Sequence, residues 1–201
     1  MITRDARPAD VPRLTELHMA CLPGDVSDFT LLGRGIVTRF YAVAQSRRAA
    51  SVIVADEAGD LAGFVVVTPD VSALFPSTLL AGPADLARFF LTANPIGLVR
   101  AAIAKVSSGT TTVAAVPELV YLGVDARYRG HGVGGALVDA ADAAFRAAGI
   151  AGYELNVHAS NASACRLYLA KGLVVTRRYA KGGHEMLAME RRLSLPAVQP
   201  S

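Results

Sequence analysis

The hydrophobic pattern of the second half of the chain alternates between helix and strand periods. An apolar run over 119–124 predicts a buried strand, and apolar residues at three- and four-residue spacing predict an amphipathic helix over 132–148 that Gly149 ends. The same criteria predict a strand over 153–157, a helix over 161–171, and strands over 173–179 and 184–191. This order predicts an α/β domain with at least one parallel pair of strands.

The first half begins with a short strand over 2–4, followed by a helix that Pro8 opens. A second helix is predicted over about 29–45, and strands over 51–55 and 61–68 form a hairpin around a polar turn. The first helix carries its apolar stripe at Val11, Leu14, Leu17, His18 and Cys21.

The length of 201 residues suits one domain, which we expect to span residues 1–192. The stretch of about 70–116 departs from the regular pattern and is predicted to be a helical insertion, because Pro83 and Pro95 each begin a helix-like segment. Residues 193–201 hold two prolines and are predicted to form a flexible tail.

The charge of the chain argues against several classes of partner. The net charge is only +3 and its basic pairs are scattered, so no nucleic-acid surface is expected. No run reaches the roughly 20 apolar residues of a membrane span, and the N-terminus lacks the apolar core of a signal peptide. Cys21 and Cys165 lie too far apart for a metal motif, which predicts reduced thiols, no metal site and a cytoplasmic location.

A glycine-rich turn joins the strand over 119–124 to the helix that follows it. Residues without a Cβ at Gly130, Gly132, Gly134 and Gly135 let the backbone curl tightly and approach a ligand. The first amides of a helix have no acceptor within it, and the helix dipole favours negative charge there. The turn therefore predicts a site for two linked phosphates.

The sequence of this turn fits two other interpretations. One is a glycine-rich helix start without a ligand. The other is a nicotinamide-dinucleotide site, because Gly130, Gly132 and Gly135 fit the G-x-G-x-x-G pattern and Glu154 follows at a suitable distance. However, five residues separate Val124 from Gly130, and Glu154 begins a strand where the dinucleotide fold requires an acid at a strand end.

The residues Arg129-Gly-His-Gly-Val-Gly134 match the [Arg/Gln]-x-x-Gly-x-Gly signature and resemble the GNAT superfamily of N-acetyltransferases. The run over 155–173 is similar to a second block of that family, in which an Asn opens a helix and a Tyr follows seven residues later. This resemblance implies the GNAT fold, an α/β (α+β) domain. Its mixed central sheet of about six to seven strands contains a splayed parallel pair, is flanked by helices, and here has the helical insertion before the fourth strand.

The resemblance also implies acetyl-CoA as co-substrate, without a metal. The backbone edge of Leu122, Gly123 and Val124 would pair with the pantetheine arm. Asn161 would approach the cofactor, although an Asn at a helix start also serves as a cap alone. The pyrophosphate would lie on the amides of Arg129, Gly130, His131, Gly132, Val133, Gly134 and Gly135.

Two side chains are candidates for the chemistry. Tyr168 matches the family Tyr that protonates the departing thiolate and contacts the cofactor; the alternative is a buried aromatic on an amphipathic helix. Glu118 is the candidate general base, on the same predicted strand face as Leu122 and Val124, and the alternative is a solvated charge at a strand start. His158 is a weaker candidate base, and Tyr121 and Asn156 are candidates to line the acceptor side.

The predicted reaction is direct acetyl transfer to a primary amine of a small molecule. The stretch over 22–41 and the insertion resemble a bacterial subgroup associated with surface-polysaccharide synthesis, which implies an amino-sugar acceptor. A non-catalytic acyl-CoA-binding module is the alternative function, and a nicotinamide-dinucleotide-binding domain is the second. No nucleic-acid partner or stable membrane insertion is expected, and the pattern allows a homodimer.

Overall fold

A seven-stranded mixed sheet organises the protein. The computed structural model describes residues 1–22, 33–47, 50–71 and 116–195, together with residues 24, 27, 30, 31 and 74. The strand order is β1-β2-β3-β4-β5-β7-β6, and every neighbouring pair is antiparallel except β4 and β5. The strands are β1 (Ile2–Asp5), β2 (Ser51–Glu57), β3 (Asp60–Thr68), β4 (Glu118–Val124), β5 (Gly152–His158), β6 (Val174–Lys181) and β7 (His184–Arg192).

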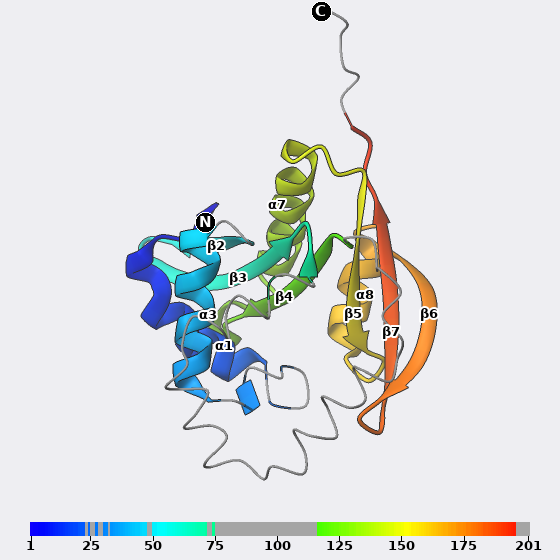
Figure 1. Ribbon diagram of the computed structural model, residues 1–201, viewed down its shortest axis with the longest axis horizontal. Helices are drawn as coiled ribbons and strands as arrows, with labels where there is room; N and C mark the ends of the chain where they lie inside the picture. The colour runs from blue at the N-terminus through cyan, green and yellow to red at the C-terminus, as the bar shows by residue number, and fades with distance from the viewer. Residues whose placement is uncertain are drawn as a thin grey trace, which may run out of the picture.

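Four α-helices within the described ranges cover the sheet: α1 (Val11–Cys21), α3 (Arg34–Arg47), α7 (Val133–Ala147) and α8 (Ala162–Ala170). Short 3-10 turns, η1 (Pro8–Asp10) and η2 (Ala126–Tyr128), precede α1 and α7. Figure 1 shows α1 and α3 beside β2, β3 and β4, and α8 beside β5 and β7. Among the described residues, no helix combines the length and apolar character that crossing a bilayer requires.

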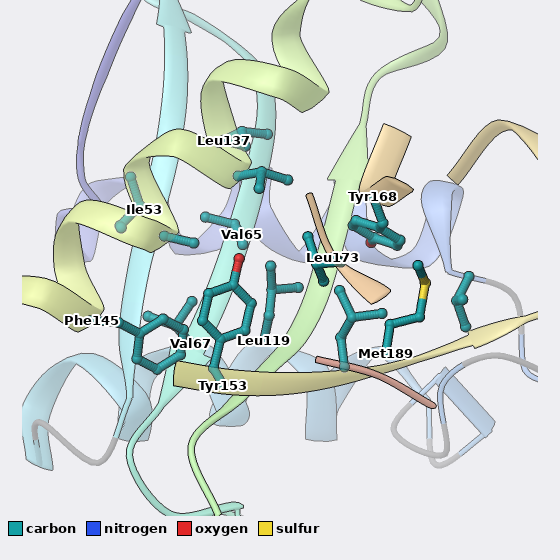
Figure 2. Packing of buried hydrophobic residues seen from close by; sticks show 14 of the residues in the cluster. Ile53, Val65, Val67, Leu119, Leu137, Phe145, Tyr153, Tyr168, Leu173 and Met189 are labelled. Atoms are coloured by element: carbon teal, nitrogen blue, oxygen red, sulfur yellow. The ribbon is translucent and has the colours of Figure 1, made fainter. Parts of the chain in front are cut away.

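Each face of the sheet packs against its own helices. Alternate residues of β3 point to opposite sides, so Val65 and Val67 join α7 and α8, while Phe64 and Val66 join α1 and α3. Figure 2 shows the first of these clusters, with Leu137 of α7 and Tyr168 of α8. A strand covered on both faces reads as a continuous apolar run, which is the pattern of β3.

The predicted strands, and the predicted helices outside the insertion, are confirmed with ends that shift by a few residues, and β4 with β5 is the predicted parallel pair. The second helix, α3, begins later than predicted, at Arg34. Gly33 directly precedes it with a φ of 94°, a left-handed conformation that an α-helix does not contain. The predicted insertion over 70–116 lies mostly outside the described residues, as does the end of the tail.

A buried ion pair joins α7 to the far part of the sheet. Asp142 of α7 is 3% exposed, and its carboxylate accepts hydrogen bonds from the Tyr153 hydroxyl (2.9 Å) and from Nη2 of Arg191 (2.9 Å). Tyr153 lies on β5 and Arg191 on β7. The Arg191 Nε also donates to the Asp142 carboxylate, at 3.2 Å. The burial of this carboxylate is therefore balanced by a cation and a hydroxyl, as a buried charge requires.

His18 is fully buried in the cluster between α1, α3 and the sheet. Its Nδ1 lies 2.9 Å from the Tyr41 hydroxyl and its Nε2 lies 2.9 Å from the Ser27 hydroxyl. Its ring also stacks on Phe64. Burial disfavours the imidazolium and lowers the pKa of His18 from 6.5 to about 4.

We expect the free energy of unfolding to fall as the pH drops from about 6.5 to about 4. In this range the unfolded chain binds a proton at residue 18 and the native chain does not, so acid favours unfolding. The loss should reach about 3 kcal/mol at the acidic end, at 1.36 kcal/mol per pKa unit. Urea titrations at pH 7.0, 6.0 and 5.0 measure it, and His18→Gln should flatten the profile. An equal slope in both proteins would show that His18 is not the group responsible.

Candidate active site

A cleft opens where β4 and β5 separate. The two parallel strands pair through a single register position, Glu118 with Glu154, next to a hydrogen bond of 2.9 Å from the Glu154 amide to the Pro117 carbonyl. Beyond this point the strands diverge (Figure 1). The cavity between them has a volume of about 250 Å³ and is lined by Leu22, 119–122, 155–158, Ser160, Asn161, Ala164, Tyr168 and Met186.

The edge of β4 that faces the cavity contains the backbone predicted to pair with a pantetheine arm. β3 pairs with the other edge of β4, and no described strand pairs with β4 on the cavity side beyond Glu118. The carbonyl of Val124 is already occupied, because it accepts hydrogen bonds from Sγ of Cys21 (3.4 Å) and Nε of Arg129 (3.2 Å). The backbone of Gly123 faces β3, because the Asp125 amide donates to the Ala62 carbonyl of β3 and every second residue along β4 presents the same edge. Leu122 is therefore the best placed of the three predicted residues.

A register shift in β4 corrects the prediction of which way Glu118 faces. Leu119 and Tyr121 pair with consecutive residues of β3, so Val120 is an extra residue and the alternation of faces reverses there. Leu119 and Leu122 consequently both pack toward α7 and α8. Glu118 lies on the opposite face, toward α1 and α3, and the prediction that it shares a face with Leu122 and Val124 is wrong.

The glycine-rich turn has the conformation that its sequence predicted. Gly130 and Gly132 have φ values of 81° and 78°, and Gly132 is the N-cap of α7. The Ala136 amide donates to the Gly132 carbonyl (3.0 Å), so the amides of the preceding first turn have no acceptor within the helix. These amides lie at the positive end of the helix dipole, which suits an anion.

Two of the glycines also have a packing function. A Cβ at Gly134 would lie 3.0 Å from Cδ2 of Leu167, and a Cβ at Gly135 would lie 3.2 Å from Cε of Lys171. Leu167 belongs to α8 and Lys171 caps its C-terminus, so these glycines let α8 approach the start of α7. Nζ of Lys171 also binds Asp139 of α7 at 2.6 Å. The sequence analysis assigned all four glycines to ligand approach and missed this helix contact.

Charged side chains hold the turn in place. The Asp125 carboxylate accepts hydrogen bonds from the Arg127 amide (3.0 Å) and side chain (2.8 Å) and from Nη2 of Arg13 (2.8 Å). The Arg127 and Arg13 donors hold the pKa of Asp125 well below its usual range. Arg13 belongs to α1, so this contact ties the turn to the N-terminal helix. The sequence analysis missed it, because residues 13 and 125 are distant along the chain.

Arg129 and His131 shape the turn through backbone contacts. Arg129 reaches back to Val124 through its Nε, as described above. Nδ1 of His131 lies 2.9 Å from the carbonyl of Arg129. The ring of His131 is exposed and, through this contact, lies beside the same short loop.

Tyr168 lies on α8 with only 7% of its surface exposed, within the apolar cluster of Figure 2. It also borders the cavity. Burial raises the pKa of its hydroxyl. Within the described chain this hydroxyl has no hydrogen-bond partner, so it is available to a group in the cavity. Tyr168 is thus a buried aromatic residue, as the structural interpretation predicts, and it also lines the cleft, as a role as general acid requires.

Asn161 is the N-cap of α8, as its residue type predicted. Its Oδ1 accepts a hydrogen bond of 3.1 Å from the Ala164 amide, and the residue also lines the cavity. His158, at the end of β5, lines the cavity as well, and its ring lies 4.9 Å from that of His184.

Glu118 is half-buried at the start of β4 and does not line the cavity directly. Burial raises the pKa of its carboxyl, and the nearby Glu154 adds to this effect. Asn156, which does line the cavity, donates from Nδ2 to Oε1 of Glu118 at 3.3 Å and opposes the shift. A carboxyl group with a raised pKa accepts a proton more readily than an ordinary one, as a general base must.

Tyr179 of β6 is a residue that the sequence analysis missed. Its hydroxyl donates to Oδ1 of Asn156 at 2.8 Å, although 23 residues separate the two along the chain. The sequence of β6 gave no signal for it, because the strand does not alternate and is exposed at every position except Tyr179.

Comparisons with known proteins agree with this geometry. The sequence pattern of the acetyltransferase (GNAT) family matches residues 12–173. No curated protein matches the chain. Among solved structures, an acetyltransferase is 22% identical with a TM-score of 0.63, covering 96% of this chain and 100% of that one.

Two further structures share the fold at lower identity. The ribosomal-protein-S18-alanine N-acetyltransferase of Escherichia coli is 15% identical with a TM-score of 0.61, covering 100% of this chain and 98% of that one. The protein yncA of Salmonella typhimurium, solved with its cofactor acetyl-CoA, is 17% identical with a TM-score of 0.63, with the same two coverages. At these identities the likeness concerns the fold.

Alanine should change the free energy of unfolding in opposite directions at a glycine with a left-handed backbone and at a glycine within a helix. Gly132→Ala forces a side chain into a left-handed conformation and should lower the free energy of unfolding by about 1–2 kcal/mol. Gly35→Ala, in α3 with no atom within 4 Å of the new Cβ, should raise it by up to about 1 kcal/mol. Chemical denaturation of both variants measures the effects. A Gly132→Ala protein as stable as the wild type would contradict the conformation of the turn.

Proposed function

Since the chain belongs to the acetyltransferase (GNAT) family, as the match over residues 12–173 establishes, we propose that it transfers an acetyl group from acetyl-CoA to a primary amine of a small molecule. The observation that carries the proposal is the cleft between β4 and β5. One end of this cleft lies at the strand that leads into the amide-rich start of α7. Its lining includes Tyr168, which has a titratable hydroxyl, and Asn156, which binds the carboxylate of Glu118.

The residues present fit coenzyme A in three respects. The amides of residues 129–135 would hold the pyrophosphate at the positive end of α7. The free edge of β4 at Leu122 would pair with an amide of the pantetheine arm. Asn161 uses Oδ1 as a cap, which leaves Nδ2 to donate to the cofactor. The solved acetyl-CoA complex of yncA, which has the same fold, supports this choice of cofactor.

The chemistry follows from the two side chains. The nitrogen of the neutral amine forms a bond to the thioester carbonyl carbon, and Glu118 accepts a proton from that nitrogen, either directly or through an ordered water. The carbon–sulfur bond then breaks. Tyr168 donates its proton to the departing thiolate, and the amide product carries the acetyl group. Positioning of the amine against the thioester supplies much of the rate.

We assign an amino sugar as the acceptor and the cytoplasm as the place of reaction. The resemblance of residues 22–41 to the polysaccharide-associated subgroup supports the acceptor, and His158 and Ser160 line the cavity with polar groups suited to sugar hydroxyls. Cys21 and Cys165 are free thiols, as a reducing compartment favours.

Binding and turnover together test the proposal. Calorimetry should show binding of acetyl-CoA and CoA and none of NAD. A thiol-release assay with acetyl-CoA should then respond to a panel of amines, with amino sugars the best acceptors. Binding of CoA without thiol release for any amine would instead indicate an acyl-CoA-binding module, and binding of NAD alone would indicate a dinucleotide site.

Tyr168→Phe should lower kcat by about 100-fold or more, because general acid catalysis contributes this much. The Kd for acetyl-CoA should stay within about twofold of the wild type, since the ring that packs against the cleft is kept. Tyr128→Phe is the matched control, because its hydroxyl binds Asp60 outside the cavity. Wild-type turnover in Tyr168→Phe would remove the acid role.

A further inference from the structure

A chain of hydrogen bonds crosses the sheet from β6 to β4 on the face opposite α7 and α8. The Tyr179 hydroxyl donates to Oδ1 of Asn156 at 2.8 Å, and Nδ2 of Asn156 donates to Oε1 of Glu118 at 3.3 Å. The chain joins the outermost strand of the sheet to the start of β4, where the cleft closes.

Hydrogen-bond chemistry sets the direction of this chain. An ionised carboxylate only accepts, so Asn156 must turn its amide nitrogen toward Glu118. Its carbonyl oxygen then faces Tyr179, whose hydroxyl must act as the donor. The donor and acceptor of each hydrogen bond in the chain are therefore fixed. Tyr179 is the residue that holds the Asn156 amide in this orientation.

The pairing of β5, β7 and β6 brings Asn156 and Tyr179 together. Asn156 pairs with Ala188 of β7, while Tyr179 pairs with Met186 two residues away. The phenol therefore reaches diagonally across β7, and the small side chain of Ala188 leaves room for it. Within β6, which the structure describes in full, Tyr179 alone is half-buried and its neighbours are exposed.

We propose that Tyr179 is a positioning residue for acetyl transfer: it holds the Asn156 amide so that Glu118 is kept in place to accept the proton of the amine. The proposal rests on the proposed function, in which Glu118 is the base. It extends the active centre to β6, a strand outside both sequence blocks that carry the family resemblance.

The positioning role of Tyr179 can be measured through the pKa of Glu118, which depends on the groups around its carboxyl. Glu154 of β5 faces it and raises the pKa of its carboxyl together with burial, while Lys181 of β6 and the Asn156 donor lower it. On β3 its register partner is the uncharged Thr68. Without Tyr179 the amide of Asn156 is free to turn away, so the pKa of Glu118 should rise.

Tyr179→Phe should move the acidic limb of the kcat/KM profile for the amine upward by about one pH unit. It should leave the KM for acetyl-CoA unchanged, since the residue is remote from the glycine-rich turn. Thr176→Val is the matched control on the same strand, because its hydroxyl binds only the Ala188 carbonyl (3.3 Å); its profile should equal that of the wild type. In a Glu118→Gln background, Tyr179→Phe should add no further loss.

A second measurement does not depend on turnover. The carboxyl carbon of Glu118, followed by NMR over pH, should titrate at higher pH in Tyr179→Phe than in the wild type and Thr176→Val. An equal titration midpoint in the three proteins would overturn the positioning role. A wild type that transfers no acetyl group to any amine would contradict the proposed function instead, and the carboxyl titration would still decide the role of Tyr179.

Discussion

The separation of β4 from β5 is the constraint on which the rest of the protein depends. Parallel strands normally pair along their length, and their backbone groups are then satisfied within the sheet. Here pairing stops after one register position, so the facing strand edges must find other partners or face a cavity. Apolar packing offsets this cost, because β4 contributes side chains to both hydrophobic clusters and β5 contributes Tyr153, Leu155 and Val157 to the first. The same unpaired edge is what an extended, amide-containing ligand could use.

Much of this arrangement was predictable from the sequence, because it depends on local signals. The glycines of residues 130–135 predicted the turn, and the 3.6-residue pattern after them predicted α7. Asn161 predicted the start of α8, since its side chain caps the helix in the structure. The strand order was not readable from periodicity; the family resemblance implied a mixed sheet with a splayed parallel pair, and the structure shows the order.

What the sequence did not reveal depends on contacts between distant residues. The extra residue at Val120 reverses the alternation of β4, and no local feature of the strand marks it. The partners of Asp125 and of Asn156 lie on other elements, so only the assembled sheet brings Arg13 and Tyr179 to them. The dual role of Gly134, which serves both the turn and the approach of α8, is likewise visible only when the helices are packed.

The ion pair of Asp142 has a consequence for the mechanics of the cleft. The separation of β4 from β5 divides the sheet into two blocks. One contains β1, β2, β3 and β4, and the other contains β5, β7 and β6. Within the described residues, strands of the two blocks pair at the closed end of the cleft alone. α7 packs on β2, β3 and β4 in the first block, and through Asp142 it is fastened to Tyr153 and Arg191 in the second. The helix thus acts as a brace across the gap. Together with the stacking of Phe145 on Tyr153, this buried carboxylate resists separation of the two blocks along the line of α7.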